Sequence, residues 1–295
     1  MIDGGLLLDK PVGITSNRAL QEAKKRLGAK KAGHAGTLDP LASGLLLLLF
    51  GEATKLAGPL MEADKEYLAT LKLGEKTSTG DAEGEVLERK PFTGTEAQVA
   101  AVLGRFRGEI RQVPPMHSAL KHEGVPLYEL ARKGETVERQ ARRVRITALE
   151  AIRLELPYLE LRVRCSKGTY VRTLAEDIGE ALGSCAHLAA LRRTGSGRWR
   201  VEDAVHLEAL ASQPRQHVLP LAALLQDLPR AEVGAREEAR FRNGQCLARS
   251  AATGLCAVYG PNGGVVGLGE ARDGKLRPVR LLAPAQAADK TPKSL

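Results

Sequence analysis

The chain has 295 residues, which is enough for one large domain with a substantial core and a smaller second domain. It is 43% hydrophobic and 27% charged, as is ordinary for a soluble globular protein, and its longest apolar run, Leu45–Phe50, is too short to cross a membrane. The net charge of +9 favours a polyanionic partner, most simply nucleic acid, although an anionic membrane surface also fits the charge.

Cysteine and histidine spacing gives no sign of a metal site or of a disulfide framework. The four cysteines include no C-x-x-C pair, and the six histidines form no H-E-x-x-H pattern. The first residues lack the cationic start and the long apolar region of a signal peptide. These features predict a reduced, cytoplasmic protein without a metal.

The first part of the chain indicates strand, helix and strand. Residues Gly5–Pro11 predict a short buried strand that ends at the proline. Thr15 or Ser16 can then cap a helix that ends at Gly28. The run Leu45–Phe50 fits a strand buried on both faces, although a buried helical segment would show the same pattern.

The middle of the chain mixes strands and helices without a regular βαβ rhythm. Residues Glu66–Leu73 and Leu159–Cys165 predict strands, and residues Ala97–Phe106 predict a helix. A second helix is expected after Leu159–Cys165, with Thr169 as its cap. An irregular, proline-marked and then basic segment before Leu159 looks inserted between the regular elements. This mixture predicts an α+β fold with a mixed sheet rather than a doubly wound one.

A second domain is expected after the interruption at Leu228–Val233. Short strands and glycine turns follow it at hairpin spacing, which is typical of a small β-barrel. The last stretch, "APAQAADKTPKSL", has too little apolar content to pack and predicts a disordered tail.

A lone carboxylate, Asp39, stands in the small-residue loop "GTLDPLASG" just before the apolar run. A turn explains it, because Asp before Pro commonly bends a chain, yet loops fixed by a buried strand often carry catalytic groups. Hydrolysis of a sugar bond usually takes two carboxylates, and other acids in the chain leave a glycosidase open. One carboxylate is enough when a nucleoside base leaves C1′, turns in the pocket and rebonds through carbon.

Five segments in order resemble the bacterial tRNA pseudouridine-55 synthases of the TruB family. They are "GGLLLDKPVGITSN", "AGHAGTLDPLASGLLLLLFGEATK", "DKEYLATLKLGEKTSTGDAEGE", "VPPMHSALKHEGVPLYELARKG" and "CSKGTYVRTLAEDIGEALGSCAHLAALRRTGSG". The resemblance runs from Gly4 to about Gly197 and resumes weakly in the C-terminal barrel. Five motifs in order, with the loop Gly36–Gly44 intact, make a highly specific match.

The resemblance implies a catalytic domain over residues 1–229 with an inserted thumb at about residues 105–145 that clasps the T arm of tRNA. It implies a PUA-like RNA-binding domain over residues 230–284, followed by the tail at 285–295. Because a guide-RNA-dependent relative would be expected to lack the thumb, the resemblance implies a stand-alone enzyme. We expect a monomer that uses no cofactor, guide RNA or obligate protein partner.

The resemblance also assigns roles in the base pocket. Asp39 matches the catalytic aspartate, which acts as a nucleophile or in an equivalent elimination route. Arg172, in "GTYVRT", matches the arginine that pairs with this aspartate and favours its charged form. Tyr67 matches a tyrosine that stacks on the target uracil, although core packing on a strand face would also explain it. Tyr170 matches a second pocket tyrosine, and Leu191 an apolar residue against the base.

RNA contacts are expected around this pocket. His34 matches a histidine that touches the RNA where bases have been flipped out. Basic residues are candidates for phosphate contacts; these are Lys10, Lys30, Lys31, Arg132, Lys133, Arg142 and Arg143.

The leading interpretation is therefore an isomerase that converts uridine 55 in the T loop of tRNA to pseudouridine. The alternative is a non-catalytic RNA-binding or tRNA-folding protein, for which the positive charge and the thumb suffice. Asp39 together with Arg172 separates the two interpretations, because binding needs neither residue.

Overall fold

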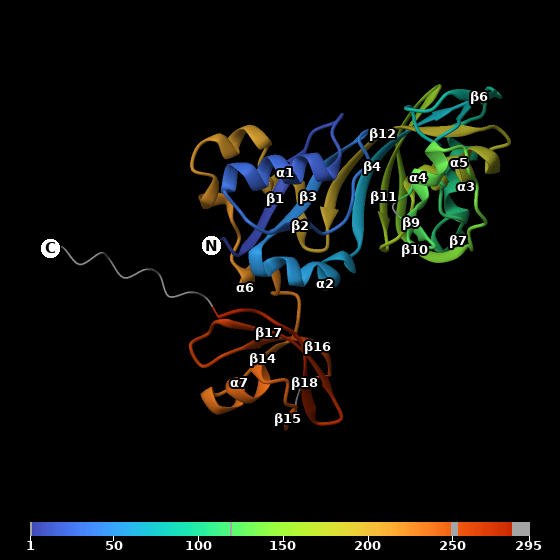
Figure 1. The fold of residues 1–295 in the computed structure, drawn as a ribbon. Helices are drawn as coiled ribbons and strands as arrows, with labels where there is room; N and C mark the ends of the chain where they lie inside the picture. Colours follow the sequence, from blue (N-terminus) through green and yellow to red (C-terminus); the bar gives the residue numbers. More distant parts are fainter. Residues whose placement is uncertain (1, 119, 249–252, 285–295) are drawn as a thin grey trace.

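The computed structural model describes residues 2–118, 120–248 and 253–284, and the predicted tail at 285–295 lies outside them. Within these residues, nine strands form one mixed sheet in the order β1-β3-β12-β4-β11-β10-β7, with β2 beside β3 and β13 beside β12 (Figure 1). Strand β12 runs parallel to β3, and the other pairs in this sheet are antiparallel. The predicted α+β fold with a mixed sheet is confirmed.

The first elements form as their patterns predict. Strand β1, Gly4–Lys10, pairs with β3, Ala42–Phe50, and nearly every residue of both strands is buried. Helix α1, Ser16–Leu27, begins after Thr15, whose side chain accepts a hydrogen bond from a backbone N–H of the first turn. The helix ends at Gly28, which adopts the left-handed conformation that favours glycine at this position. The short strand β2, Ala32–His34, follows.

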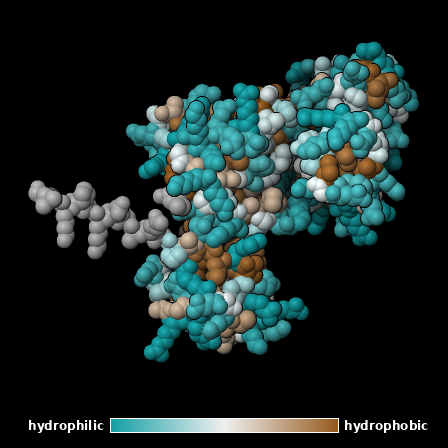
Figure 2. Space-filling view, in the orientation of Figure 1, coloured by the Kyte–Doolittle hydropathy of each residue, from teal (hydrophilic) through white to brown (hydrophobic). Residues whose placement is uncertain are grey.

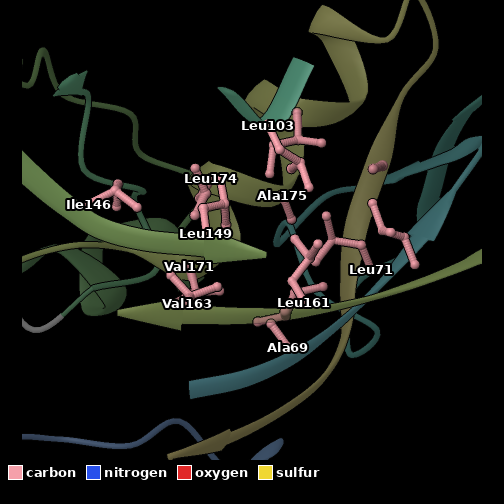
Figure 3. Close-up of a cluster of buried hydrophobic side chains, with 14 of the residues drawn as sticks. Ala69, Leu71, Leu103, Ile146, Leu149, Leu161, Val163, Val171, Leu174 and Ala175 are labelled. Atoms are coloured by element: carbon pink, nitrogen blue, oxygen red, sulfur yellow. The ribbon is translucent and has the colours of Figure 1, made fainter. Parts of the chain in front are cut away.

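The largest hydrophobic cluster lies where two helices pack on the sheet (Figure 3). The strands are β4, Lys65–Leu73; β10, Arg142–Glu155; β11, Tyr158–Cys165; and β12, Ala186–Ser196. The helices are α3, Glu96–Arg105, and α5, Val171–Ala181. Strict alternation along β11 buries its apolar residues and exposes two of its arginines, as the sequence predicts.

The cap predicted for α5 is wrong. Tyr170 occupies the N-cap position without a side-chain bond to the helix. Thr169 instead donates its hydroxyl proton to the carbonyl of Ser166 at 2.9 Å, within the preceding turn. The hydroxyl therefore stabilises the turn that leads into the helix and not the helix itself.

The inserted segment leaves and re-enters the sheet through neighbouring strands. Strand β7, Gly108–Gln112, pairs with the start of β10, so both ends of the segment belong to the sheet edge. Between these strands lie α4, Leu127–Arg132, and the two short strands β8, Lys121–His122, and β9, Val125–Pro126. The excursion itself is thus confined to residues between these two strands.

Strand β12 is a central element that the sequence pattern does not reveal. It lies between β3 and β4, and its Arg193 is paired with Gly44 on one side and Tyr67 on the other. Gly44 has φ +99°, and a Cβ there would lie 2.3 Å from the Arg193 carbonyl oxygen, so only glycine allows this approach.

The remaining elements extend the main body. They are α2, Ala57–Met61; α6, Leu221–Leu224; β5, Glu75–Thr77; β6, Val86–Arg89; and β13, Trp199–Arg200, with 3-10 turns at Gly51–Leu56, Val201–Asp203, Leu207–Ala211 and Pro214–His217. No helix among the described residues is long and apolar enough to cross a membrane.

A separate sheet occupies the C-terminal part of the described chain, in the order β14-β16-β17-β18-β15. Its elements are β14, Arg230–Glu232; α7, Ala235–Arg242; β15, Leu247–Ala248; β16, Gly254–Tyr259; β17, Val265–Arg272; and β18, Lys275–Leu281. One face packs against the main body, where Ala257 and Leu268 join a cluster with Leu47 and Leu49. Figure 2 shows hydrophobic residues gathered at this junction on an otherwise largely hydrophilic surface.

Candidate active site

The loop that carries Asp39, residues 35–41, is fixed by backbone hydrogen bonds from several elements. The Ser16 hydroxyl at the start of α1 accepts from the Leu38 N–H at 2.8 Å and donates to the Leu38 carbonyl at 2.9 Å. The Gly13 N–H donates to the Pro40 carbonyl at 2.8 Å. The Asp39 side chain, in contrast, is 43% exposed, so a rigid loop presents an accessible carboxylate.

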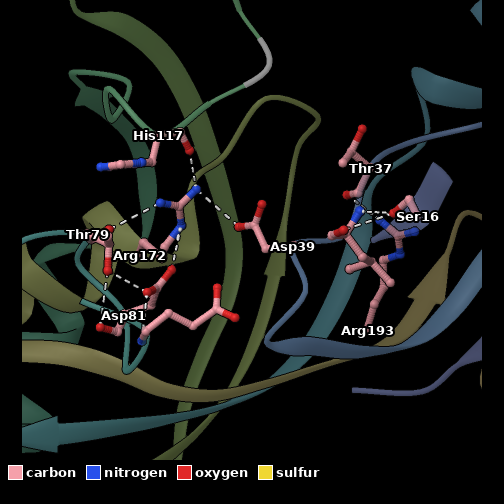
Figure 4. Close-up of polar contacts among 10 residues, drawn as sticks. Ser16, Thr37, Asp39, Thr79, Asp81, His117, Arg172 and Arg193 are labelled. Carbon is pink, nitrogen blue, oxygen red and sulfur yellow. Dashed lines mark hydrogen bonds and ion pairs between the residues drawn. The ribbon is translucent and has the colours of Figure 1, made fainter. Parts of the chain in front are cut away.

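Arg172 lies in the first turn of α5 and is buried, with 5% of its surface exposed. Its Nη2 lies 3.1 Å from Asp39 Oδ2, which confirms that the two side chains pair (Figure 4). Its other contacts are donated bonds to the carbonyls of Thr79 at 3.1 Å and His117 at 2.6 Å, and an ion pair from Nε to Asp81 at 3.6 Å. These three contacts fix the guanidinium independently of its ion pair with Asp39.

Asp81 is a second carboxylate of the site that the sequence reasoning missed. It is 4% exposed, and its Oδ1 accepts bonds from the Thr79 hydroxyl at 2.5 Å and the Glu83 N–H at 3.1 Å. Asp81 lies in the sequence "TGDAEGE", but nothing in that sequence indicates a contact with Arg172. Because Asp81 is enclosed, it holds Arg172 and does not face a substrate.

Tyr67 and Leu191 come together from neighbouring strands. Leu191 of β12 is paired with Ala69 of β4, two residues beyond Tyr67 on the same strand. Both side chains are half-buried and border the two hydrophobic clusters on this part of the sheet. Burial raises the pKa of the Tyr67 phenol above its usual value, so the ring is neutral at physiological pH. The pair offers an aromatic and an aliphatic surface close to the Asp39 loop.

Tyr170 is positioned by a residue that the sequence did not indicate. Gln112, at the end of β7 and 1% exposed, donates its side-chain amide to the Tyr170 carbonyl at 3.2 Å and accepts from the Tyr170 N–H at 3.0 Å. These two hydrogen bonds fix Tyr170, which immediately precedes Val171 and Arg172. The sheet edge at the inserted segment thereby sets the start of α5.

His34 ends β2 and lies half-buried just before the Asp39 loop. Burial, with the positive charge of Arg193, lowers the pKa of its imidazole, which favours the neutral ring. Its buried Nδ1 has no hydrogen-bond partner among the described residues. A neutral ring suits contact with a base better than contact with a phosphate.

Lys10 is wrong as a candidate for phosphate contact. It is 0% exposed, and its ammonium donates to the carbonyls of Pro11 and Ile14, each at 2.8 Å. Burial lowers the pKa of Lys10 from 10.5 to about 8. The lysine therefore stabilises the turn between β1 and α1, where a phosphate cannot reach it.

The other basic candidates remain accessible. Lys30, Lys31, Arg132, Lys133 and Arg143 are exposed, and Arg142 is half-buried. They belong to separate elements: the turn after α1, the end of α4 and the start of β10. Arg132 also lies over the ring of Tyr128, 5.6 Å from its centroid. In the part of the chain that the structure describes, no group of three or more His, Cys, Asp or Glu residues is arranged to hold a metal ion.

Comparison with protein families gives the class of protein that this fold and site define. Residues 24–171 match the N-terminal domain of the "TruB family pseudouridylate synthase", so the class is that of the pseudouridylate synthases. Residues 172–231 match the "tRNA pseudouridylate synthase B C-terminal domain", and residues 229–282 match "Pseudouridine synthase II TruB, C-terminal". The chain belongs to the TruB family.

Individual relatives agree with this assignment. The chain is 54% identical over 296 residues to the tRNA pseudouridine synthase B of Ralstonia nicotianae, across 95% of this chain and 94% of that protein. It is also 54% identical over 293 residues to the protein of the same name from Burkholderia mallei, across 95% and 97% of the two chains.

Two solved structures share the fold. One is described as an H/ACA RNP bound to a substrate RNA containing 2′-deoxyuridine, with a TM-score of 0.73, 26% identity, and coverage of 95% of this chain and 85% of the other. The second is a Cbf5–Nop10–Gar1 complex, with a TM-score of 0.74, 28% identity, and coverage of 95% and 84%.

Proposed function

We propose that the protein isomerises uridine to pseudouridine at position 55 in the T loop of tRNA, with Asp39 as the catalytic carboxylate. The observation that carries the proposal is the ion pair between the exposed Asp39 of the loop and the buried Arg172 of α5, whose side chains lie 3.1 Å apart. Binding RNA requires no such pair. Relatives that are 54% identical across 95% of the chain are named tRNA pseudouridine synthase B, which supports tRNA as the substrate.

The reaction needs no net change in atoms. Asp39 attacks C1′ or assists elimination there, and the bond between N1 and C1′ breaks with its electron pair passing to the uracil. The base turns, and C5 bonds to C1′ as the Asp39–C1′ bond breaks and returns its electron pair to the carboxylate; in the elimination route, the proton taken from C2′ returns to that carbon instead. The hydrogen on C5 is then lost as a proton while N1 gains one. Arg172 pairs with Asp39 at 3.1 Å and fixes the direction of its carboxylate.

The base pocket must hold uracil while it rotates. We assign the aromatic face to Tyr67, the aliphatic wall to Leu191 and a second ring to Tyr170. Apolar surfaces restrain a flat base without fixing its in-plane orientation, whereas several hydrogen bonds would oppose rotation. His34 is assigned to the RNA next to the extruded nucleotide, since extrusion leaves unstacked bases that a ring can contact.

We propose that the inserted segment around α4, together with the exposed basic residues at α4 and β10, contacts the T arm. The enzyme would then act as a monomer in the cytoplasm, without a guide RNA or an obligate partner. The matched chains in the H/ACA RNP and Cbf5–Nop10–Gar1 structures are longer than this chain: the matches cover 95% of this chain but only 84–85% of theirs. A role in tRNA folding without turnover would use the same surfaces but not Asp39.

Release of tritium from C5 of uridine in an unmodified tRNA transcript tests the proposal. The native chain is expected to release it, because C5 becomes the new point of attachment. Asp39→Asn is expected to bind the transcript normally and release none, because the amide can neither attack C1′ nor act as a base. Asp227→Asn, at a carboxylate with a 68% exposed side chain, is the control and should retain full release.

The outcomes separate the two candidate functions. Turnover by Asp39→Asn would remove Asp39 from the mechanism. Tight binding with no tritium release from the native chain would leave a non-catalytic RNA-binding protein.

A further inference from the structure

Arg193 is a buried cation of the sheet that the reaction described above does not use. It stands on β12 between β3 and β4, and it is 2% exposed. Its neighbour Arg192 is half-exposed and forms a paired contact with Asp9, at 2.6 Å and 3.0 Å. Two adjacent arginines on one strand thus have different surroundings.

The Arg193 guanidinium donates to three backbone carbonyls around the Asp39 loop. Its Nη1 donates to Thr37 at 3.4 Å (Figure 4). Its Nε donates to Leu45 at 2.6 Å and its Nη2 to Gly36 at 3.2 Å. Gly36 and Thr37 belong to the loop itself, while Leu45 belongs to β3. The side chain therefore ties the first half of the loop to the strand that follows it.

The absence of an ion pair makes this arrangement informative. Among the described residues, no Asp or Glu oxygen lies within 4.0 Å of the Arg193 guanidinium. A buried charge is costly unless it is paired or fully hydrogen-bonded. Here two loop carbonyls and the Leu45 carbonyl of β3 supply hydrogen bonds to the charge, so part of its stabilisation depends on the loop keeping this conformation.

The backbone conformation is consistent with the same constraint. Gly36 has φ +101° and Gly44 has φ +99°, so the loop begins and the strand continues with left-handed backbone. Such a path needs fixed partners to exclude other conformations. Ser16 supplies them at Leu38, and Arg193 supplies them at Gly36 and Thr37.

Arg193 also acts on the proposed base pocket. Its charge opposes the increase that burial causes in the pKa of the Tyr67 phenol. The same charge contributes to lowering the pKa values of His34 and Lys10. The cation is thus central to the loop, the tyrosine and the histidine at once.

We propose that Arg193 is a positioning residue: its three bonds to the carbonyls of Gly36, Thr37 and Leu45 hold the loop so that Asp39 meets Arg172 and Tyr67 in the reactive arrangement. This inference rests on the proposed function for its catalytic consequence. The clamp itself is a structural statement and can be tested without turnover.

The test compares Arg193→Met and Arg193→Lys with the native chain in single-turnover tritium release and in tRNA binding. Because small misplacement of a reacting group costs about 100-fold in rate, Arg193→Met should slow release by about 100-fold while tRNA affinity is unchanged. Arg193→Lys keeps the charge but loses the three-donor geometry, and about a tenfold loss is expected. This split between rate and affinity would not follow from a general loss of folded protein.

Hydrogen exchange reads the clamp directly. The amides of Ala35, Leu38 and Ala42 are bonded in the native structure, and they should exchange faster in both Arg193 variants. Arg192→Lys is the matched control on the same strand. Its side chain donates to none of the carbonyls of residues 35–41, so exchange in the loop and the rate of release should stay at native values.

Several outcomes would overturn the proposal. They are a native single-turnover rate in Arg193→Met, a rate loss matched by an equal loss of tRNA affinity, or unchanged exchange in the loop. If Arg193→Met does not fold, the same criteria apply to Arg193→Lys. If the native chain releases no tritium, the proposed function fails, and the exchange comparison still decides whether Arg193 clamps the loop.

Discussion

A single guanidinium at the centre of this site is shared by two carboxylates in different surroundings. The Asp39 side chain is 43% exposed and that of Asp81 is 5% exposed, and both lie beside Arg172. The buried acid balances the charge of the arginine inside the protein, and the exposed acid is free to face a substrate. The difference in burial assigns their different roles.

Asp81→Asn tests this division of roles. It removes one charge from Arg172 while leaving two carbonyl partners and Asp39. A hydrogen bond to a charged group contributes about 1.5–3 kcal/mol, so we expect a loss of that order in the free energy of unfolding. If the misdirected guanidinium costs a similar amount in the transition state, tritium release should slow by about 10–100-fold.

Chemical denaturation and single-turnover assays measure the two effects of this substitution. Glu85→Gln, at an exposed acid in the same turn region, is the control. An unchanged rate would show that the backbone carbonyls alone orient Arg172.

At the scale of elements, helix α5 has a first turn that is fixed by hydrogen bonds and a middle that carries a carboxyl group with a raised pKa. Its start is fixed by Gln112 through Tyr170, and its second residue is Arg172. Further along, burial first, and then the charges of Glu176 and Glu180, raise the pKa of Asp177 from 3.8 to about 6. The helix that delivers the arginine thus carries a carboxylate whose ionised form is unfavourable.

Asp177→Asn is expected to stabilise the protein at neutral pH. A carboxyl whose pKa is raised by folding opposes folding fully above the folded pKa, here about 6, and not at all below the unfolded value of 3.8. The gain in melting temperature over the native chain should therefore be largest above pH 6 and shrink as the pH falls toward 4.

Thermal unfolding at pH 7.5 and pH 4.5 measures this pH dependence. Asp273→Asn, at a carboxylate with an 88% exposed side chain, should show no such trend. A gain of equal size at both pH values would mean that packing, and not ionisation, sets the effect at Asp177.

At the scale of the whole molecule, the two sheets pack against each other through one hydrophobic cluster. Leu47 and Leu49 of β3 pack in one cluster with Ala257 of β16 and Leu268 of β17. Strand β3 therefore contributes to the core on both faces and also receives the end of the Asp39 loop. Part of the net charge of +9 lies on accessible surfaces such as the start of β10.

The double substitution Arg142→Ala with Arg143→Ala tests the use of that charge. If both arginines contact phosphates, each lost contact removes one released counterion. The slope of log K against log salt should then become less steep by about one to two units. Arg153→Ala with Arg162→Ala is the matched control, because these exposed arginines pair with Glu155 and Glu150 at the other end of β10.

Titration of tRNA binding at several salt concentrations provides the slopes for both double variants. An unchanged slope in the Arg142 and Arg143 variant would remove these residues from the interface. An equal change in the control would show that net charge, and not local contact, sets the salt dependence.

Several elements follow from the sequence because their signals are local. Helix α1 is defined by its cap at Thr15, its apolar stripe and Gly28, and each signal lies within a few residues. Strand β11 alternates strictly and is found by its pattern alone. The segments quoted for the family resemblance likewise contain Asp39, Arg172, Tyr67 and the loop glycines, so the main residues of the candidate site can be selected before any coordinates are known.

Other features depend on what surrounds a residue, which no local pattern contains. Strand β12 carries "RRTGS" in the centre of a sheet, because its arginines bind loop carbonyls and Asp9 instead of water. The sequence does not distinguish Lys10 from an exposed lysine, yet Lys10 is buried and its ammonium donates to two backbone carbonyls that it holds in place.

The sequence by itself thus determined the family, the mixed fold and the carboxylate that we propose as catalytic, since these depend on residue types and their order. Only the tertiary structure decided that Asp81 holds Arg172, that Gln112 fixes Tyr170 and that Arg193 grips the Asp39 loop. Each of these contacts joins residues that are 58 to 157 positions apart, from Gln112 with Tyr170 to Arg193 with Gly36. Contacts at that separation are set by how the elements pack, and packing is a property of the whole chain.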